Sequence, residues 1–306
     1  MDSNYSVLDK YGENFSKREY VTNPAIGRDE EIKQLILTLL TPEKSAILVG
    51  LPGIGKTAIV EGLSYRMQRG EVPNNLMGYT IYKLNTAALL GTVPGSNGEL
   101  KIQALLNEIR DSDKVILFID EIHTLIGGTD ESMDFANIFK PGLDRGSIKV
   151  IGATTTQEYE QFILTDKAFV RRFQRINVAE PTKEQTVQIL FGSLPKYEVK
   201  TGAKMKYTDF IKEKIMRFIV NLTEETNRVY EYDARYPDIC FSILQQAFSY
   251  CLSDNRTEVD IRDFKRAIQN TKLVYRDIID KHMDIFFNEF ADIYRSETVQ
   301  RLQQDD

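Results

Sequence analysis

Residues 45–57 read Ser-Ala-Ile-Leu-Val-Gly-Leu-Pro-Gly-Ile-Gly-Lys-Thr, a short apolar run that leads into a glycine-rich loop. The loop fits the pattern Gly-x4-Gly-Lys-Thr, in which glycines let the backbone curl until its N–H groups cradle nucleotide phosphates. Lys56 is expected to reach the β- and γ-phosphates, and the Thr57 hydroxyl to bind Mg²⁺. The sequence therefore predicts a site for a nucleoside triphosphate, which we take to be ATP, formed by Pro52, Gly53, Ile54, Gly55, Lys56, Thr57 and Ala58.

A second informative stretch is Val-Ile-Leu-Phe-Ile-Asp-Glu at residues 115–121. The unbroken apolar run predicts a central strand that is buried on both faces. Two carboxylates at the end of such a strand are costly unless they meet a cation or water. We expect Asp120 to hold Mg²⁺ and Glu121 to polarise the attacking water. His123 has no second His or Cys nearby, so a surface or packing role is expected for it.

Two more polar sites follow along the chain. The apolar run 150–153 ends in three threonines at 154–156, whose hydroxyls can bond a γ-phosphate or the attacking water. Arg171 and Arg172 precede the next strand candidate. Guanidinium groups stabilise the charge on a transferring phosphoryl group, and a neighbouring subunit can supply them. Taken alone, an arginine pair is also compatible with ordinary surface charge.

Hydrophobic patterning predicts an α/β architecture followed by a helical one. Short apolar runs alternate with amphipathic stretches up to about residue 180, which favours a parallel five-stranded sheet covered by helices. The expected strands are 45–49, 79–84, 115–119, 148–152 and 175–178. Pro181-Thr182 indicates the end of the α/β region followed by the N-cap of a helix. Every segment after this boundary has a helical pattern. We therefore predict an N-terminal linker, a nucleotide-binding domain, an all-helical lid and a C-terminal amphipathic tail, at residues 1–22, 23–180, 181–273 and 274–306.

The tail carries an apolar stripe, formed by Ile279, Met283, Phe286, Phe290 and Ile293 at helical spacing. Two alternatives are open for this stripe. It either docks onto the chain's own helical domain or serves as a surface for a partner or neighbouring subunit.

Composition excludes several classes of protein. The chain has 306 residues, a net charge of −6 and a pI near 5.3, which argues against a general nucleic-acid binder. It contains no apolar run long enough to span a bilayer. Cys240 and Cys251 are spaced for neither a metal site nor a redox pair. We expect a cytoplasmic protein with buried free thiols.

The order of these motifs resembles that of an AAA+ ATPase, and specifically the first ATPase module of the Clp/heat-shock disaggregase family. The resemblance covers roughly residues 8–195 and extends weakly to about residue 270. It rests on Leu8–Gly12, Asn23–Ile32, Thr57–Leu63, Gly70–Pro73, Asp120–Thr124, Gly152–Thr155 and Arg171–Gln174.

This resemblance implies roles that the residues alone do not establish. Ile26 and Gly27 would border the adenine together with Ile189 of the first lid helix. Thr155 would be the sensor threonine, and Arg171 and Arg172 would complete the active site of a neighbouring subunit. The implied assembly is a homo-oligomeric ring or spiral, hexamer-like in the family's manner, which remodels or regulates an unidentified protein partner.

The sequence also departs from the family pattern. The loop expected to grip a polypeptide in the pore, residues 90–99, contains no aromatic residue, whereas stacking against a translocating chain needs a large apolar body. Ile239 replaces a lysine of the family's lid segment. The chain lacks a second ATPase module, and its opening Met1 favours a free-standing single module over a fragment.

Three alternatives to a protein-remodelling ATPase are open. The chain could be a threading unfoldase or disaggregase that grips through Val93 and Pro94, or an adaptor or loader that acts with nucleic acid. The absence of aromatics and paired cations from the 91–98 loop disfavours the nucleic-acid alternative. A non-hydrolysing ATP binder is disfavoured because both Asp120 and Glu121 are present.

Overall fold

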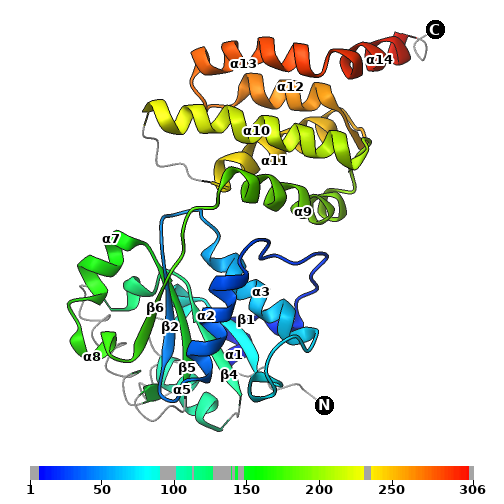
Figure 1. Ribbon diagram of the computed structural model, residues 1–306. Helices are drawn as coiled ribbons and strands as arrows, with labels where there is room; N and C mark the ends of the chain where they lie inside the picture. Colours follow the sequence, from blue (N-terminus) through cyan, green and yellow to red (C-terminus); the bar gives the residue numbers. More distant parts are fainter. Residues whose placement is uncertain are drawn as a thin grey trace, which may run out of the picture. The chain divides into compact units, whose positions relative to one another are not determined.

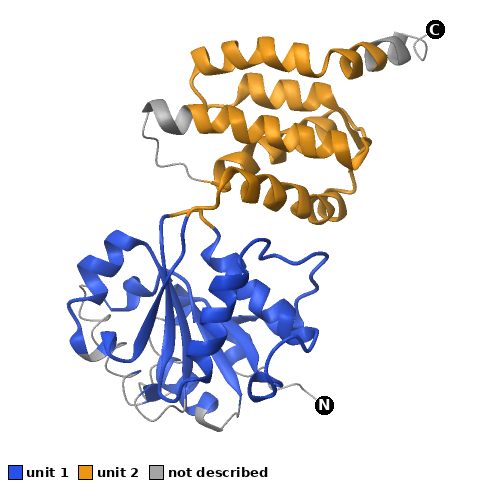
Figure 2. Cartoon of the chain, viewed as in Figure 1, with its two compact units in different colours: residues 1–51, 55–179 blue, residues 52–54, 180–306 orange. Residues whose placement is uncertain are grey.

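The computed structural model describes residues 7–89, 101–111, 114–126, 139, 142–143, 148–230 and 236–302. The chain forms two compact units, which Figure 2 distinguishes by colour. Unit 1 comprises Met1–Leu51 and Gly55–Ala179, and unit 2 comprises Pro52–Ile54 and Glu180–Asp306. Among the residues described, no helix is both long and apolar enough to cross a membrane.

Unit 1 is built on a six-stranded sheet in the order β1-β3-β4-β5-β2-β6 (Figure 1). The five predicted strands pair in parallel, as expected. The sequence analysis missed a short edge strand that runs antiparallel to β3. Its three residues, Gly-Glu-Asn, show no apolar alternation. The strands are β1 (Gly12–Asn14), β2 (Ser45–Val49), β3 (Thr80–Leu84), β4 (Val115–Ile119), β5 (Lys149–Thr154) and β6 (Phe173–Asn177).

Helices cover both faces of this sheet, which explains why β2 and β4 are continuous apolar runs. On one face, Ile47 of β2 and Leu117 of β4 share a core with Leu105 of α5 (Lys101–Asp111). On the other face, α2 (Asp29–Leu40) packs against β2, β6 and α3 (Lys56–Gln68). The remaining elements of unit 1 are α1 (Val7–Tyr11), η1 (Phe15–Lys17), η2 (Asn74–Leu76), α4 (Thr86–Leu89), η3 (Ile122–Leu125), α7 (Thr156–Glu158), the π-helical turn η4 (Tyr159–Ile163) and α8 (Lys167–Val170).

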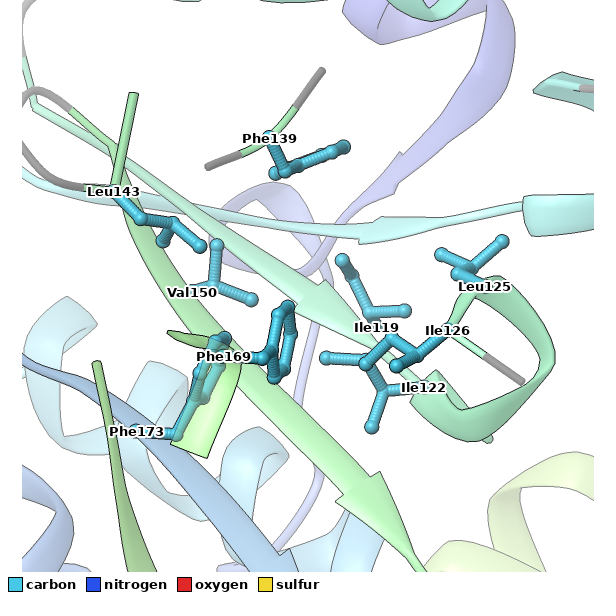
Figure 3. A pocket seen from close by; sticks show the side chains of 9 residues that line it. All are labelled: Ile119, Ile122, Leu125, Ile126, Phe139, Leu143, Val150, Phe169 and Phe173. Atoms are coloured by element: carbon cyan, nitrogen blue, oxygen red, sulfur yellow. The ribbon is translucent and has the colours of Figure 1, made fainter. Parts of the chain in front are cut away.

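A small apolar cavity lies within unit 1, beside β4 and β5 (Figure 3). Its volume is about 10 Å³, which is close to the minimum for a single water molecule. Because only apolar side chains line it, a water there would lack hydrogen-bond partners. The cavity is a packing feature of the core rather than a ligand site. Its lining residues are Ile119, Ile122, Leu125, Ile126, Phe139, Leu143, Val150, Phe169 and Phe173.

Unit 2 is mainly helical. Its first helix, α9, begins where Pro181-Thr182 predicted, because the Thr182 hydroxyl accepts a hydrogen bond from the Gln185 N–H at 3.2 Å. The sequence analysis predicted an entirely helical unit, and the structure differs in one detail. Strand β7 (Lys204–Met205) pairs in parallel with β8 (Glu258–Val259). Its helices are α9 (Lys183–Thr201), α10 (Asp209–Tyr230), α11 (Asp238–Ser253), α12 (Ile261–Asn270), α13 (Arg276–Glu289) and α14 (Ala291–Leu302).

The apolar stripe of the C-terminal tail packs into the core of unit 2. Ile279, Met283, Phe286 and Phe290 are all buried there. The Phe218 ring of α10 lies with its centroid 5.4 Å from that of Phe286 in an edge-on arrangement. For these residues, docking onto the chain's own helical unit is the arrangement that the structure adopts.

An ion-pair network fixes the start of α12. Asp260 is the N-cap, and its backbone N–H donates to the Asp263 carboxylate at 3.0 Å in a capping box. Asp263 is fully buried and pairs with Arg256, which also contacts Asp260 at 3.3 Å. Removing one member of such a network leaves a desolvated charge without its partner.

We expect Asp263→Ala to lower the free energy of unfolding by about 3 kcal/mol, because it removes both a cap and a buried ion-pair partner. Urea unfolding of the full chain, followed by circular dichroism, measures the change. The control is Asp280→Ala, because Asp280 pairs with Arg276 at 3.1 Å with both side chains more than half exposed. Such surface pairs contribute about 0–1 kcal/mol. An equal loss of unfolding free energy in the two variants would contradict the assignment of Asp263 to a buried ion-pair network.

Candidate nucleotide site

The glycine-rich loop adopts the backbone conformation that its sequence predicts. Gly53 has φ +71° and Gly55 has φ +94°, in the left-handed region that side chains other than glycine rarely adopt. Gly55 is the N-cap of α3, and no side chain caps this helix end. The first N–H groups of α3 and its positive dipole end are therefore available for an anion.

Lys56 lies inside the loop rather than in solvent. It is 8% exposed, and its ammonium donates to the carbonyl oxygens of Gly50 at 3.0 Å and Leu51 at 2.9 Å. Burial lowers the pKa of Lys56, while Glu121 and Asp120 act in the opposite direction. The ammonium is thus held where a phosphate bound to the loop would meet it.

Thr57 lies in the first turn of α3, after the loop that follows β2, and Asp120 directly follows β4. Strands β2 and β4 flank β5 in the sheet. The Thr57 hydroxyl donates to Asp120 Oδ2 at 3.2 Å, although the two residues are 63 positions apart. A hydroxyl and a carboxylate are hard oxygen ligands of the kind that Mg²⁺ prefers. The donor set therefore fits the magnesium site that the sequence predicted.

Glu121 has an unusual backbone conformation for a glutamate, with φ 50° and ψ 47°. A non-glycine residue in this left-handed region costs on the order of 1 kcal/mol, and such strain clusters at functional sites. The Thr124 N–H and hydroxyl both donate to the Glu121 carbonyl at 2.9 Å and help to fix the turn. Burial raises the pKa of the Glu121 carboxyl, and the nearby charges of Glu158 and Asp120 raise it further.

A hydrogen-bonded cluster joins this turn to the end of β5. His123 Nδ1 lies 3.1 Å from Thr154 Oγ1, 3.2 Å from Glu158 Oε2 and 3.4 Å from Glu121 Oε2. The His123 ring also stacks on Phe162, with centroids 5.8 Å apart. His123 therefore has the expected packing role, and in addition it connects the Glu121 carboxylate to β5.

Thr155 forms the N-cap of α7 in a capping box with Glu158. Its hydroxyl accepts from the Glu158 N–H at 3.2 Å, and Glu158 Oε2 accepts from the Thr155 N–H at 3.0 Å. A hydroxyl that accepts one hydrogen bond can still donate another, so the cap is compatible with a bond to phosphate or water. The sensor role of Thr155 stays a prediction.

The remaining predicted residues lie in different places. Arg171 is exposed, whereas Arg172 is buried directly before β6, where its carbonyl accepts from the Ser45 N–H at 2.9 Å. Ile26 is half-buried beside Gly27 in unit 1, and Ile189 is half-buried in α9 of unit 2. In the loop itself, Pro52 is exposed and Ile54 is buried, and Ala58 follows in the first turn of α3. The 90–99 loop lies outside the described residues.

Sequence reasoning missed two charged residues of the site, Lys83 and Glu158. Lys83 Nζ lies 3.0 Å from Asp120 Oδ2. A lysine inside the apolar run 79–84 was the available signal for it. The Thr-x-x-Glu pattern at 155–158, a capping-box signature, was the signal for Glu158.

The fold and the site together indicate the class of nucleotide-binding protein to which the chain is similar. A glycine loop between a parallel strand and a helix, with acidic residues at the end of a nearby strand, is typical of P-loop nucleotide-binding proteins. Residues 46–180 match the family described as "ATPase family associated with various cellular activities (AAA)".

Curated relatives point to one branch of this family. The chain is 40% identical over 267 residues to chaperone protein ClpB of Staphylococcus epidermidis, covering 84% of this chain and 30% of that protein. It is 45% identical over 211 residues to ClpB of Clostridium perfringens, covering 67% and 24%. The chain thus spans less than a third of the length of these relatives.

Solved structures of Hsp104 share the fold. A closed-state cryo-EM reconstruction of Hsp104 with ATPyS and FITC casein has a TM-score of 0.73 and 36% identity, covering 86% of this chain and 45% of that one. The Saccharomyces cerevisiae Hsp104–ADP complex has a TM-score of 0.69 and 37% identity, covering 85% and 44%. Residues 46–180 thus match the AAA family, and the chain resembles a Clp disaggregase module over most of its length.

Proposed function

We propose that the chain hydrolyses ATP at the site formed by the glycine loop and the acidic pair after β4. The observation that carries this proposal is the 3.2 Å hydrogen bond between Thr57 and Asp120, which joins the phosphate-binding element to the acidic pair. Thr57 and Asp120 would hold Mg²⁺, which would neutralise negative charge on the bound phosphates.

The chain's own residues then have distinct tasks. The N–H groups of the loop and of α3 bind the phosphates, and Lys56 neutralises the β- and γ-oxygens. Glu121 orients the attacking water and accepts its proton, a role that suits a carboxylate with a raised pKa. Thr155 positions the same water or the γ-phosphate through its hydroxyl.

Arginine from a neighbouring copy of the chain would complete this site. Arg171 is exposed at the turn before β6, so it is the better placed of the two arginines to reach a neighbour. Arg172 is buried within its own subunit. We assign the contact with the neighbour's phosphate to Arg171 and a supporting position at the turn to Arg172.

We further infer that the assembly is a ring or spiral of identical subunits that uses ATP turnover to remodel a protein partner. The support is the similarity to ClpB and Hsp104, relatives that are named as chaperones or solved with casein. Threading of a polypeptide is the second candidate, and the lack of an aromatic residue at 90–99 disfavours it.

Subunit mixing tests the shared active site. We expect the Arg171→Ala/Arg172→Ala variant and the Glu121→Gln variant each to lose at least about 10²-fold in ATP turnover when assayed alone. A mixture should regain turnover, because intact arginines of the second variant then face intact sites of the first. Steady-state phosphate release, measured across mixing ratios, gives the result.

Analytical ultracentrifugation with ATP and Mg²⁺ accompanies the assay, since both variants must still assemble. The single variants Arg171→Ala and Arg172→Ala separate contact with the neighbour from local support. A mixture that assembles but stays inactive would contradict action in trans. So would full turnover by a strictly monomeric chain.

A further inference from the structure

Lys83 introduces a positive charge at the predicted magnesium site. It is the one charged residue of β3, in the sequence Thr-Ile-Tyr-Lys-Leu. In the parallel register Lys83 lies opposite Phe118 of β4, and its Nζ lies 5.6 Å from the centroid of the Phe118 ring. Asp120 follows Phe118 by two positions, which places its side chain within reach on the same side of the sheet.

One oxygen of Asp120 has two donors. Oδ2 accepts from Lys83 Nζ at 3.0 Å and from the Thr57 hydroxyl at 3.2 Å. The Lys83 and Asp120 side chains are about one-third exposed, at 32% and 28%. The lysine therefore neutralises the carboxylate on which Mg²⁺ binding depends, and it does so at the atom nearest to the second proposed ligand.

A cleft lies beside the Lys83–Asp120 ion pair and provides space next to the Lys83 ammonium. The cleft has a volume of about 570 Å³ and is lined by Lys83, Asp120 and Glu121, together with residues that include Glu13 and Thr86. Glu13 is exposed, lies opposite Lys83 in the pairing of β1 with β3, and forms an ion pair with Arg18 at 3.3 Å. Because the Lys83 side chain itself lines this cleft, there is open volume next to the ion pair.

We propose that Lys83 is a positioning residue that competes with Mg²⁺ for Asp120. In the absence of the metal, the ion pair holds the carboxylate beside Thr57. Binding of Mg²⁺ requires that pair to break and then leaves two cations near one carboxylate. Lys83 therefore raises the Mg²⁺ concentration that nucleotide binding requires. This inference rests on the proposed function, because it assumes that Thr57 and Asp120 bind the metal.

The test measures Mg²⁺-dependent binding of the non-hydrolysable analogue β,γ-imido-ATP by isothermal titration calorimetry at a series of Mg²⁺ concentrations. We expect Lys83→Met to lower the Mg²⁺ concentration for half-maximal binding by about 10-fold, because a unit charge is removed next to the metal. Lys83→Arg should keep the wild-type requirement. Lys83→Gln keeps a hydrogen-bond donor but removes the charge, and it should behave like Lys83→Met.

The control is Lys33→Met, since Lys33 is an exposed lysine of α2 in the same unit. It removes an equal charge far from Asp120 in sequence and should leave the Mg²⁺ requirement unchanged. An unchanged or higher requirement in Lys83→Met and Lys83→Gln would overturn the inference, and so would an equal decrease in Lys33→Met. Absence of analogue binding at every Mg²⁺ concentration in the unaltered chain would instead overturn the proposed function.

Discussion

Glu121→Gln is expected to lower ATP turnover by about 10²- to 10⁴-fold, the usual contribution of a positioned general base. Glutamine matches the shape of glutamate but cannot accept a proton from water. The Lys56 loop contacts and the bond from Thr57 to Asp120 do not involve the Glu121 side chain, so ATP should still bind. Phosphate release and equilibrium binding of ATP, measured on the same preparation, separate the two effects.

The matched control is Glu160→Gln, because Glu160 is an exposed glutamate of the turn after α7. Its turnover should equal that of the unaltered chain. If Glu121→Gln retained more than about a tenth of normal turnover, Glu121 would not be the base. A pull-down with the Glu121→Gln variant, with and without ATP, then reports whether capture of a protein partner depends on the nucleotide.

Lys56→Ala is expected to weaken ATP binding by at least about 10²-fold, since it removes a charge-assisted contact with the β- and γ-phosphates. Turnover at ordinary ATP concentrations should then be lost. Calorimetry of ATP binding in the presence of Mg²⁺ measures the change. The variant also leaves the Gly50 and Leu51 carbonyls without this donor, so thermal unfolding must be measured to show that the loop remains folded.

Lys33→Ala serves as the control for lost positive charge, because Lys33 is exposed on α2. Its affinity for ATP should not change. Nucleotide binding of normal strength by a folded Lys56→Ala variant would contradict the assignment of the glycine loop.

The sequence predicted much of the fold because its signals are local and strong. The apolar run 115–119 required burial on both faces, and the structure places it as β4 within the parallel sheet. Pro181-Thr182 predicted the start of α9. Strand β1 was missed because it is only three residues long, and the β7–β8 pair was missed because each strand has two residues and little pattern.

The site was predicted less completely than the fold. The motif positions 50–57 and 120–121 followed from residue type and spacing. Lys83 was missed because it does not stand next to a motif in sequence, and Glu158 was missed because the capping-box pattern that begins at Thr155 was not recognised. They reach the site through the pairing of β3 with β4 and through the cap of α7. The roles of Thr155, Arg171 and Ile189 stay predictions.

By itself the sequence determined the local conformations, because glycine placement, helix caps and apolar runs act through neighbouring residues. The left-handed Gly55 before α3 is one example. Tertiary structure decided which distant groups meet. The order of β3, β4, β5 and β2 brings Lys83 and Thr57 to the same carboxylate oxygen, Oδ2 of Asp120. Strand order depends on packing of the whole sheet and its helices, which no short stretch of chain encodes.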